Sequence, residues 1–71
     1  MNIKDKIEYF LMLLELFAQK YNLSCEQAYS YISKYNGVEY VEQQYNILHT
    51  LSFPDMVESL SAFCKRNGGN L

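Results

Sequence analysis

The chain has little of the material from which small proteins build covalent staples, metal sites or phosphate-binding loops. Its 71 residues include two cysteines, one histidine, one proline and three glycines, and no tryptophan. Two cysteines are too few for the disulfide framework of a small secreted domain, and with one histidine at these separations they match no zinc-ligand spacing. We therefore expect no metal, no cofactor and a reducing, cytoplasmic location. Whether Cys25 and Cys64 pair stays open.

Long apolar runs are also missing. The longest apolar stretch covers residues 9–18, in which Glu15 is the one polar residue. Ten residues are about half of what a membrane-spanning helix needs. Asp5 and Glu8 lie where a signal peptide would carry positive charge, and no cleavage site of small residues follows. We therefore expect neither a signal peptide nor a membrane span.

Basic residues are absent from a large part of the chain. Residues 35–64 contain four acidic residues and no Lys or Arg, although the whole chain has a net charge of only −2. Non-specific binding to nucleic acid depends on clustered Lys and Arg. The acidic stretch therefore argues against a nucleic-acid partner and favours a protein partner with a basic surface.

Apolar and aromatic residues are plentiful. Hydrophobic residues make up 49% of the chain, and seven Tyr and four Phe supply its aromatic rings. A disordered chain carries far less of both. At this length the chain has room for one folded domain, residues 1–71.

The first part of the chain has the apolar spacing of a helix over residues 4–21. One stripe of this helix, with spacing 4-3-4-3-4, contains Ile3, Ile7, Phe10, Leu14, Phe17 and Tyr21. Met12, Leu13 and Leu16 fall outside the stripe. The helix is thus apolar over more than one face, so we expect either a central helix or one that also contacts a partner.

A capping signal predicts a second helix over residues 25–35. The Ser24 hydroxyl can accept from the backbone N–H of Gln27 while the Gln27 side chain reaches back, which is a capping box. The helix is expected to end at Asn36-Gly37, with Gly37 in the left-handed conformation.

Two more helices complete the chain. Apolar residues at 3-4-3 spacing predict a helix over residues 38–49. Ser52 as the cap and Pro54 in the first turn predict another over 53–66, after which we expect a frayed tail, residues 67–71. No convincing strand pattern is present. The predicted fold is all-α, either a compact four-helix bundle or an orthogonal helical array.

The isolated polar residues do not form a recognisable catalytic motif. His49 has no neighbour that marks it as a general base, and at a helix end a histidine more often hydrogen-bonds a terminal carbonyl. Cys25 is at a helix N-terminus, where a thiol is more acidic, but lacks a second cysteine or a histidine nearby. Glu39 and Glu42 are typical of a solvated acidic face. We therefore predict no catalytic residue and no enzyme activity.

A small DNA-binding regulator is the alternative. Residues 24–49 have the outline of a helix-turn-helix, with the turn at Asn36-Gly37. The recognition helix would be residues 38–48, which carry two Glu and no Lys or Arg and would meet phosphates with the wrong sign.

A set of positions within residues 23–63 matches a known sequence pattern. These positions are Leu23-Ser24, Lys34-Tyr35 before Gly37, Tyr40, Tyr45, Leu48-His49-Thr50 and Val57-Glu58, and the most specific part is Tyr-x-x-Leu-His-Thr from Tyr45 to Thr50. On these positions the chain resembles a family of small uncharacterised bacterial proteins classed as a domain of unknown function. The resemblance implies no catalytic residue. It does imply genes often placed beside toxin-like or ADP-ribosyltransferase-like genes, and so an antitoxin-like role.

The sequence thus predicts a non-enzymatic protein-interaction module. The partner is either a second copy of the chain or the product of a neighbouring gene. The contact residues should come from the apolar first helix and from a tyrosine-bearing, acidic surface. The predicted partner-binding residues are Met12, Leu13, Leu16, Tyr31, Glu39, Tyr40, Glu42, Tyr45 and His49.

Overall fold

The structure is a computed structural model that describes residues 3–71, with side chains from residue 5 onward. Its helices are α1 (Ile3–Tyr21), α2 (Cys25–Lys34), α3 (Gly37–Leu48) and α4 (Phe53–Arg66). This part of the chain contains no strand. The prediction of an all-α fold is confirmed, and the helix ends lie within one residue of the expected positions.

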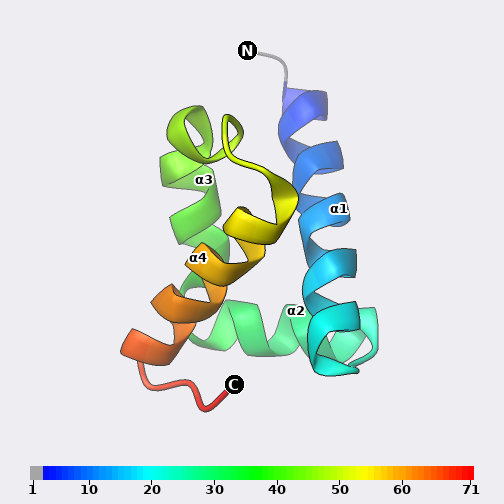
Figure 1. Cartoon of the computed structure of the whole chain (residues 1–71), viewed down its shortest axis with the longest axis vertical. Helices are drawn as coiled ribbons and strands as arrows, with labels where there is room; N and C mark the ends of the chain where they lie inside the picture. Colours follow the sequence, from blue (N-terminus) through cyan, green and yellow to red (C-terminus); the bar gives the residue numbers. More distant parts are fainter. Residues whose placement is uncertain (1–2) are drawn as a thin grey trace.

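The helices form a bundle in which α2 lies across one end of the other three (Figure 1). Helix α1 contacts each of the other helices, α3 contacts α4, and α2 contacts α3. The molecule measures 32 × 22 × 19 Å along its principal axes. Short connections force this arrangement, because two to four residues can join only neighbouring helix ends.

The core is made by one face of each helix. Its largest fully buried side chains are Leu13, Phe17, Ile32, Met56, Leu60 and Cys64. The molecule exposes 4641 Å², close to the roughly 4,600 Å² expected for a folded monomer of this mass. The chain therefore buries as much surface as a complete small protein without help from a partner.

The core face of α1 includes Phe10, Leu14, Phe17 and Tyr21 of the predicted stripe, but it is rotated toward Leu13 and away from Ile7. Leu13, predicted to face a partner, is completely buried, whereas Ile7, predicted to belong to the core stripe, is 54% exposed. The side chain of Ile3 lies outside the described residues. The rotation follows from packing, since α1 is apolar on several sides and the positions of α2, α3 and α4 decide which side becomes the core.

The turn between α2 and α3 differs from the expectation in one respect. Asn36, not Gly37, takes the left-handed conformation, with φ of 65°. Gly37 is needed for a different reason, because a Cβ at this position would lie 2.6 Å from Cγ2 of Ile32 and 3.0 Å from Sγ of Cys64. The turn thus brings the start of α3 into close contact with α2 and α4.

At the start of α2 the predicted capping box is present. The backbone N–H of Gln27 donates to Oγ of Ser24 at 3.0 Å, and the backbone N–H of Ser24 donates to Oε1 of Gln27 at 2.9 Å. In the same way Oγ of Ser52 accepts from the backbone N–H of Asp55 at the start of α4. Both local signals act as the sequence suggests.

Tyrosine hydroxyls connect α1 and α3 to distant parts of the chain. The Tyr9 hydroxyl donates to the backbone carbonyl of Leu48 at 3.2 Å, and the Tyr21 hydroxyl is hydrogen-bonded to Ser61. The Tyr40 hydroxyl lies 2.8 Å from Oγ of Ser59. Burial, and to a lesser extent the neighbouring phenol of Tyr45, raise the pKa of Tyr9. These bonds satisfy the polar tips of rings whose apolar parts pack against the core.

The C-terminal tail, residues 67–71, is predicted from the sequence to fray, but in the structure it folds back onto the protein. The backbone N–H of Gly69 donates to the carbonyl of Cys64 at 2.9 Å. The backbone N–H of Leu71 donates to the Tyr31 hydroxyl on α2 at 3.1 Å. The tail therefore lies between the end of α4 and α2 (Figure 1).

We predict that Gly37→Ala lowers the free energy of unfolding by about 1–3 kcal/mol, measured by urea denaturation. The added methyl would collide with Ile32, and this cost exceeds the at most ~1 kcal/mol that Ala gains over Gly in a helix. Ser30→Ala, at an exposed position of α2, is the control and should change stability little. An unchanged or increased stability of Gly37→Ala would show that the close approach carries no cost.

Candidate functional site

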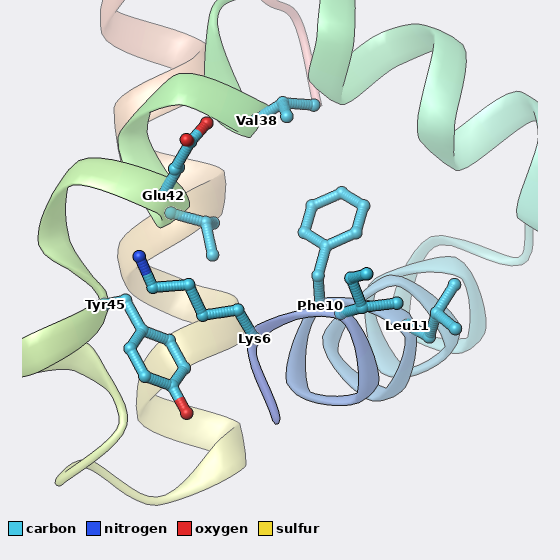
Figure 2. Close-up of a pocket in the computed structure, with 8 residues that line it drawn as sticks. Lys6, Phe10, Leu11, Val38, Glu42 and Tyr45 are labelled. Carbon is cyan, nitrogen blue, oxygen red and sulfur yellow. The ribbon is translucent and has the colours of Figure 1, made fainter. Parts of the chain in front are cut away.

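An apolar groove of about 330 Å³ opens between α1 and α3. Helix α1 contributes Lys6, Ile7, Phe10 and Leu11, and α3 contributes Val38, Val41, Glu42 and Tyr45 (Figure 2). We call this the α1–α3 groove. The two walls differ in burial, since α1 supplies the exposed residues Ile7 and Leu11 and α3 supplies the buried residues Val41 and Tyr45.

The floor of the groove is part of the core, and its rim is open. Val41 and Tyr45 are almost completely buried, at 4% and 8% exposed. Ile7 and Leu11 on the rim are 54% and 56% exposed. They are four residues apart on α1, so they lie one above the other along the helix. Exposure of two adjacent large aliphatic side chains beside an apolar hollow is typical of an interaction surface.

Aromatic contacts hold the groove in shape. The Phe10 ring meets the Tyr29 ring of α2 edge to face, with centroids 6.4 Å apart. The Tyr45 ring packs edge to face on Tyr9 with a centroid distance of 5.3 Å. Because both rings are fixed from outside the groove, its walls do not depend on a bound partner.

The groove is lined by one basic and one acidic side chain, Lys6 on α1 and Glu42 on α3. Lys6 extends from α1 toward α3 (Figure 2), and its Nζ lies 5.7 Å from the centre of the Tyr45 ring. Glu42 is exposed on α3, and so is Glu39 one turn before it. Since α3 carries no Lys or Arg, its side of the groove is acidic.

The groove contains two of the nine residues predicted from the sequence, Glu42 and Tyr45. Glu39 is exposed near it on α3. Leu13 lies in the core, because its position on α1 points at the centre of the bundle. Burial removes this residue from any surface contact in the folded chain.

Tyr31 and Tyr40 are engaged within the chain. The Tyr31 ring stacks on Phe17 with centroids 5.9 Å apart, and its hydroxyl accepts from the tail. The Tyr40 ring stacks on Phe63 at 4.2 Å. Both rings are half-buried, so they lie at the edge of the core.

Met12 and Leu16 lie away from the groove, on the other edge of α1. Met12 is 46% exposed and Leu16 is half-buried. Two edges of α1 are therefore apolar, one beside α3 and one beside α4. The sequence showed an excess of apolar residues on this helix without showing how they divide between the edges.

His49 lies at the C-terminal end of α3 as its C-cap residue. Its Nδ1 lies 2.7 Å from the backbone carbonyl of Tyr45, and its ring stacks on the Tyr45 ring with centroids 4.9 Å apart. This is the terminal-carbonyl contact expected for a histidine at a helix end. The ring is exposed, but it is not among the residues that line the groove.

Sequence reasoning missed the rim residues Ile7 and Leu11 and the wall residue Val38. The sequence spacing places Ile7 in the core stripe, and it does not mark Val38 as a contact residue. A signal was available, because Ile7 and Leu11 form an i, i+4 aliphatic pair on a helix with more apolar residues than one core face requires.

A comparison with known families matches residues 8–67 to a family described as "Protein of unknown function (DUF3791)". The chain belongs to this family. The match includes all of α2, α3 and α4 and most of α1. The α3 wall of the groove and Phe10 and Leu11 of the α1 wall fall within the DUF3791 region, whereas Lys6 and Ile7 precede it. No curated protein and no solved structure matches the chain.

Among residues 3–71 there is no group of three or more His, Cys, Asp and Glu side chains placed to hold a metal ion. Within the same residues no helix has both the length and the apolar character required to cross a membrane.

The two cysteines are free and lie in different environments. Cys25 is exposed at the start of α2, whereas Cys64 is completely buried in the inner face of α4. Burial raises the pKa of the Cys64 thiol to about 11. Since thiolate is the reactive form, Cys64 is doubly protected, by lack of access and by its protonation.

We predict that a thiol reagent at pH 9 modifies Cys25 within minutes and leaves Cys64 unmodified in the folded protein. Cys25→Ser should then show no fast reaction, and urea should expose one reactive thiol in that variant. Mass spectrometry of the labelled protein gives the count. Rapid labelling of Cys64 without denaturant would contradict the closed core around α4.

Proposed function

We propose that this protein is a non-enzymatic interaction module that binds a partner protein in the α1–α3 groove. The observation that supports the proposal is the pairing of an open apolar hollow with two rim residues, Ile7 and Leu11, that are each more than half exposed. Leaving this apolar surface in water is costly, and covering it with a partner recovers that free energy.

The shape of the groove suits an amphipathic helix. Its walls are two helices, and the α3 wall extends from Val38 to Tyr45. Seven residues of helix span about 10 Å, which is the distance between positions i and i+7 of a bound helix. Two or three apolar side chains at i, i+3 or i+4, and i+7 would then enter the groove.

The charge around the groove favours basic flanks on that helix. Glu39 and Glu42 are exposed on α3, and α3 has no basic residue to balance them. Lys or Arg beside the apolar ridge of the partner would meet these carboxylates at the rim. Such rim pairs act more on association rate and selectivity than on affinity.

The partner that we propose is the product of a neighbouring gene, which the family resemblance suggests to be toxin-like. An antitoxin-like role would follow if the bound partner were held inactive. The groove exists without the partner, because the free chain already buries its full core.

We predict that Leu11→Glu lowers affinity for the product of the neighbouring open reading frame by roughly tenfold or more, measured by calorimetry after co-expression. A carboxylate at this rim position would be buried against apolar side chains and would add to the acidity of the groove. Ile47→Glu is the matched control, since Ile47 is an equally large exposed residue, 64% exposed, on α3 and is not part of the groove lining.

Circular dichroism of both variants should show the helix content of the original protein, because both positions are exposed. Equal binding by both variants would remove the groove as the binding surface. If the protein instead shifted duplex DNA at physiological salt, the helix-turn-helix alternative would replace the interaction module.

A further inference from the structure

A second apolar surface lies on the opposite edge of α1, where it meets α4. Leu16, Phe53, Pro54 and Val57 line a shallow hollow of about 600 Å³, and Lys20 and Glu58 are at its edge. We call this the α1–α4 seam. Met12, 46% exposed, precedes Leu16 by one turn and extends the apolar surface along α1.

The two helices of the seam run in the same direction. Tyr9 of α1 stacks on Phe53 at the start of α4, with centroids 5.6 Å apart. Eleven residues further along α1, Nζ of Lys20 lies 3.7 Å from Oε1 of Glu58. The seam is therefore apolar near the start of α4, where Tyr9 contacts Phe53. At its other end it carries one cation, Lys20 on α1, beside one anion, Glu58 on α4.

Because of this arrangement of apolar and charged residues, the seam of one copy is complementary to the seam of a second copy. A twofold axis parallel to the two helices would keep each level of the seam opposite the same level of a second copy. It would also exchange the sides, so that α1 of one copy faces α4 of the other. Lys20 would then face the second copy's Glu58, and Met12 and Leu16 would face its Phe53 and Pro54.

We propose that a second copy of this chain docks on the α1–α4 seam through such a twofold axis. Charge favours this occupant over the basic partner of the α1–α3 groove. The charges of Lys20 and Glu58 cancel, so the seam has no net charge. In the dimer, Lys20 of each copy would face Glu58 of the other, which gives two such pairs. A basic helix would instead face Lys20.

The Lys20–Glu58 pair does little for the isolated chain. The side chains are 39% and 78% exposed, and ion pairs in such exposed positions contribute little to stability. Their arrangement gains importance in the dimer, where surrounding apolar contacts exclude water and where like charges would repel.

The seam and the α1–α3 groove use different edges of α1. Leu11 and Leu16 are five residues apart, which places them about 140° apart around the helix. A dimer formed through the seam therefore leaves the groove open on both copies. The proposed dimer does not depend on the function proposed for the groove, and each has its own variants.

The test is the oligomeric state of charge-reversed variants, measured by sedimentation equilibrium from micromolar to millimolar concentration. The original protein should dimerise. Lys20→Glu and Glu58→Lys should each raise the dimer dissociation constant by roughly tenfold or more, because each creates two like-charge contacts per dimer. An equimolar mixture of the two variants should dimerise again, since each new charge then faces an opposite charge on the other chain.

The mixture separates contact between chains from damage within a chain. In the Lys20→Glu chain the new carboxylate stays beside Glu58 whether or not the other variant is present, so a folding defect would not be rescued. Glu42→Lys, a charge reversal on the groove side, is the matched control and should dimerise like the original protein. A monomeric original protein, dimers formed by both single variants, or a mixture that stays monomeric would each overturn the proposal.

Discussion

The structure depends on the complete burial of one face of α1. Leu13 and Phe17 have no exposed surface, and the helix that carries them contacts every other helix. A chain of this length has a small core, so its central helix must pack against all the other helices. The orientation of α1 about its axis then decides which of its remaining apolar residues reach the surface, and on which side.

Two apolar edges of α1 result from this orientation, and they differ in charge. The edge beside α3 faces a helix that carries Glu39 and Glu42 and no basic residue. The edge beside α4 ends in the Lys20–Glu58 pair. Similar amounts of exposed apolar surface would thus select different partners, because burial supplies the attraction and charge selects the partner.

Local signals made the helices predictable from the sequence, and tertiary packing limited the prediction of their contacts. The caps at Ser24 and Ser52 satisfy N–H groups within three residues, so their outcome needs no knowledge of the rest of the chain. The choice between Ile7 and Leu13 for the core depends on where α2, α3 and α4 lie. So does the role of Gly37, whose close neighbours include Cys64 of α4. Glu42 and Tyr45 were predicted as contact residues, but the groove that joins them to Ile7 and Leu11 arises only when α1 and α3 pack together.

The long-range tyrosine bonds have a consequence during protein synthesis. Tyr9 binds the carbonyl of Leu48, and Tyr21 binds Ser61 about forty residues later. Helix α1 leaves the ribosome before α3 and α4, so the part of its apolar face that packs against α4 has no covering until the last helix emerges. During that interval the nascent α1 is a potential ligand for chaperones and a site of aggregation. The core is thus complete only when its last helix, α4, packs against α1.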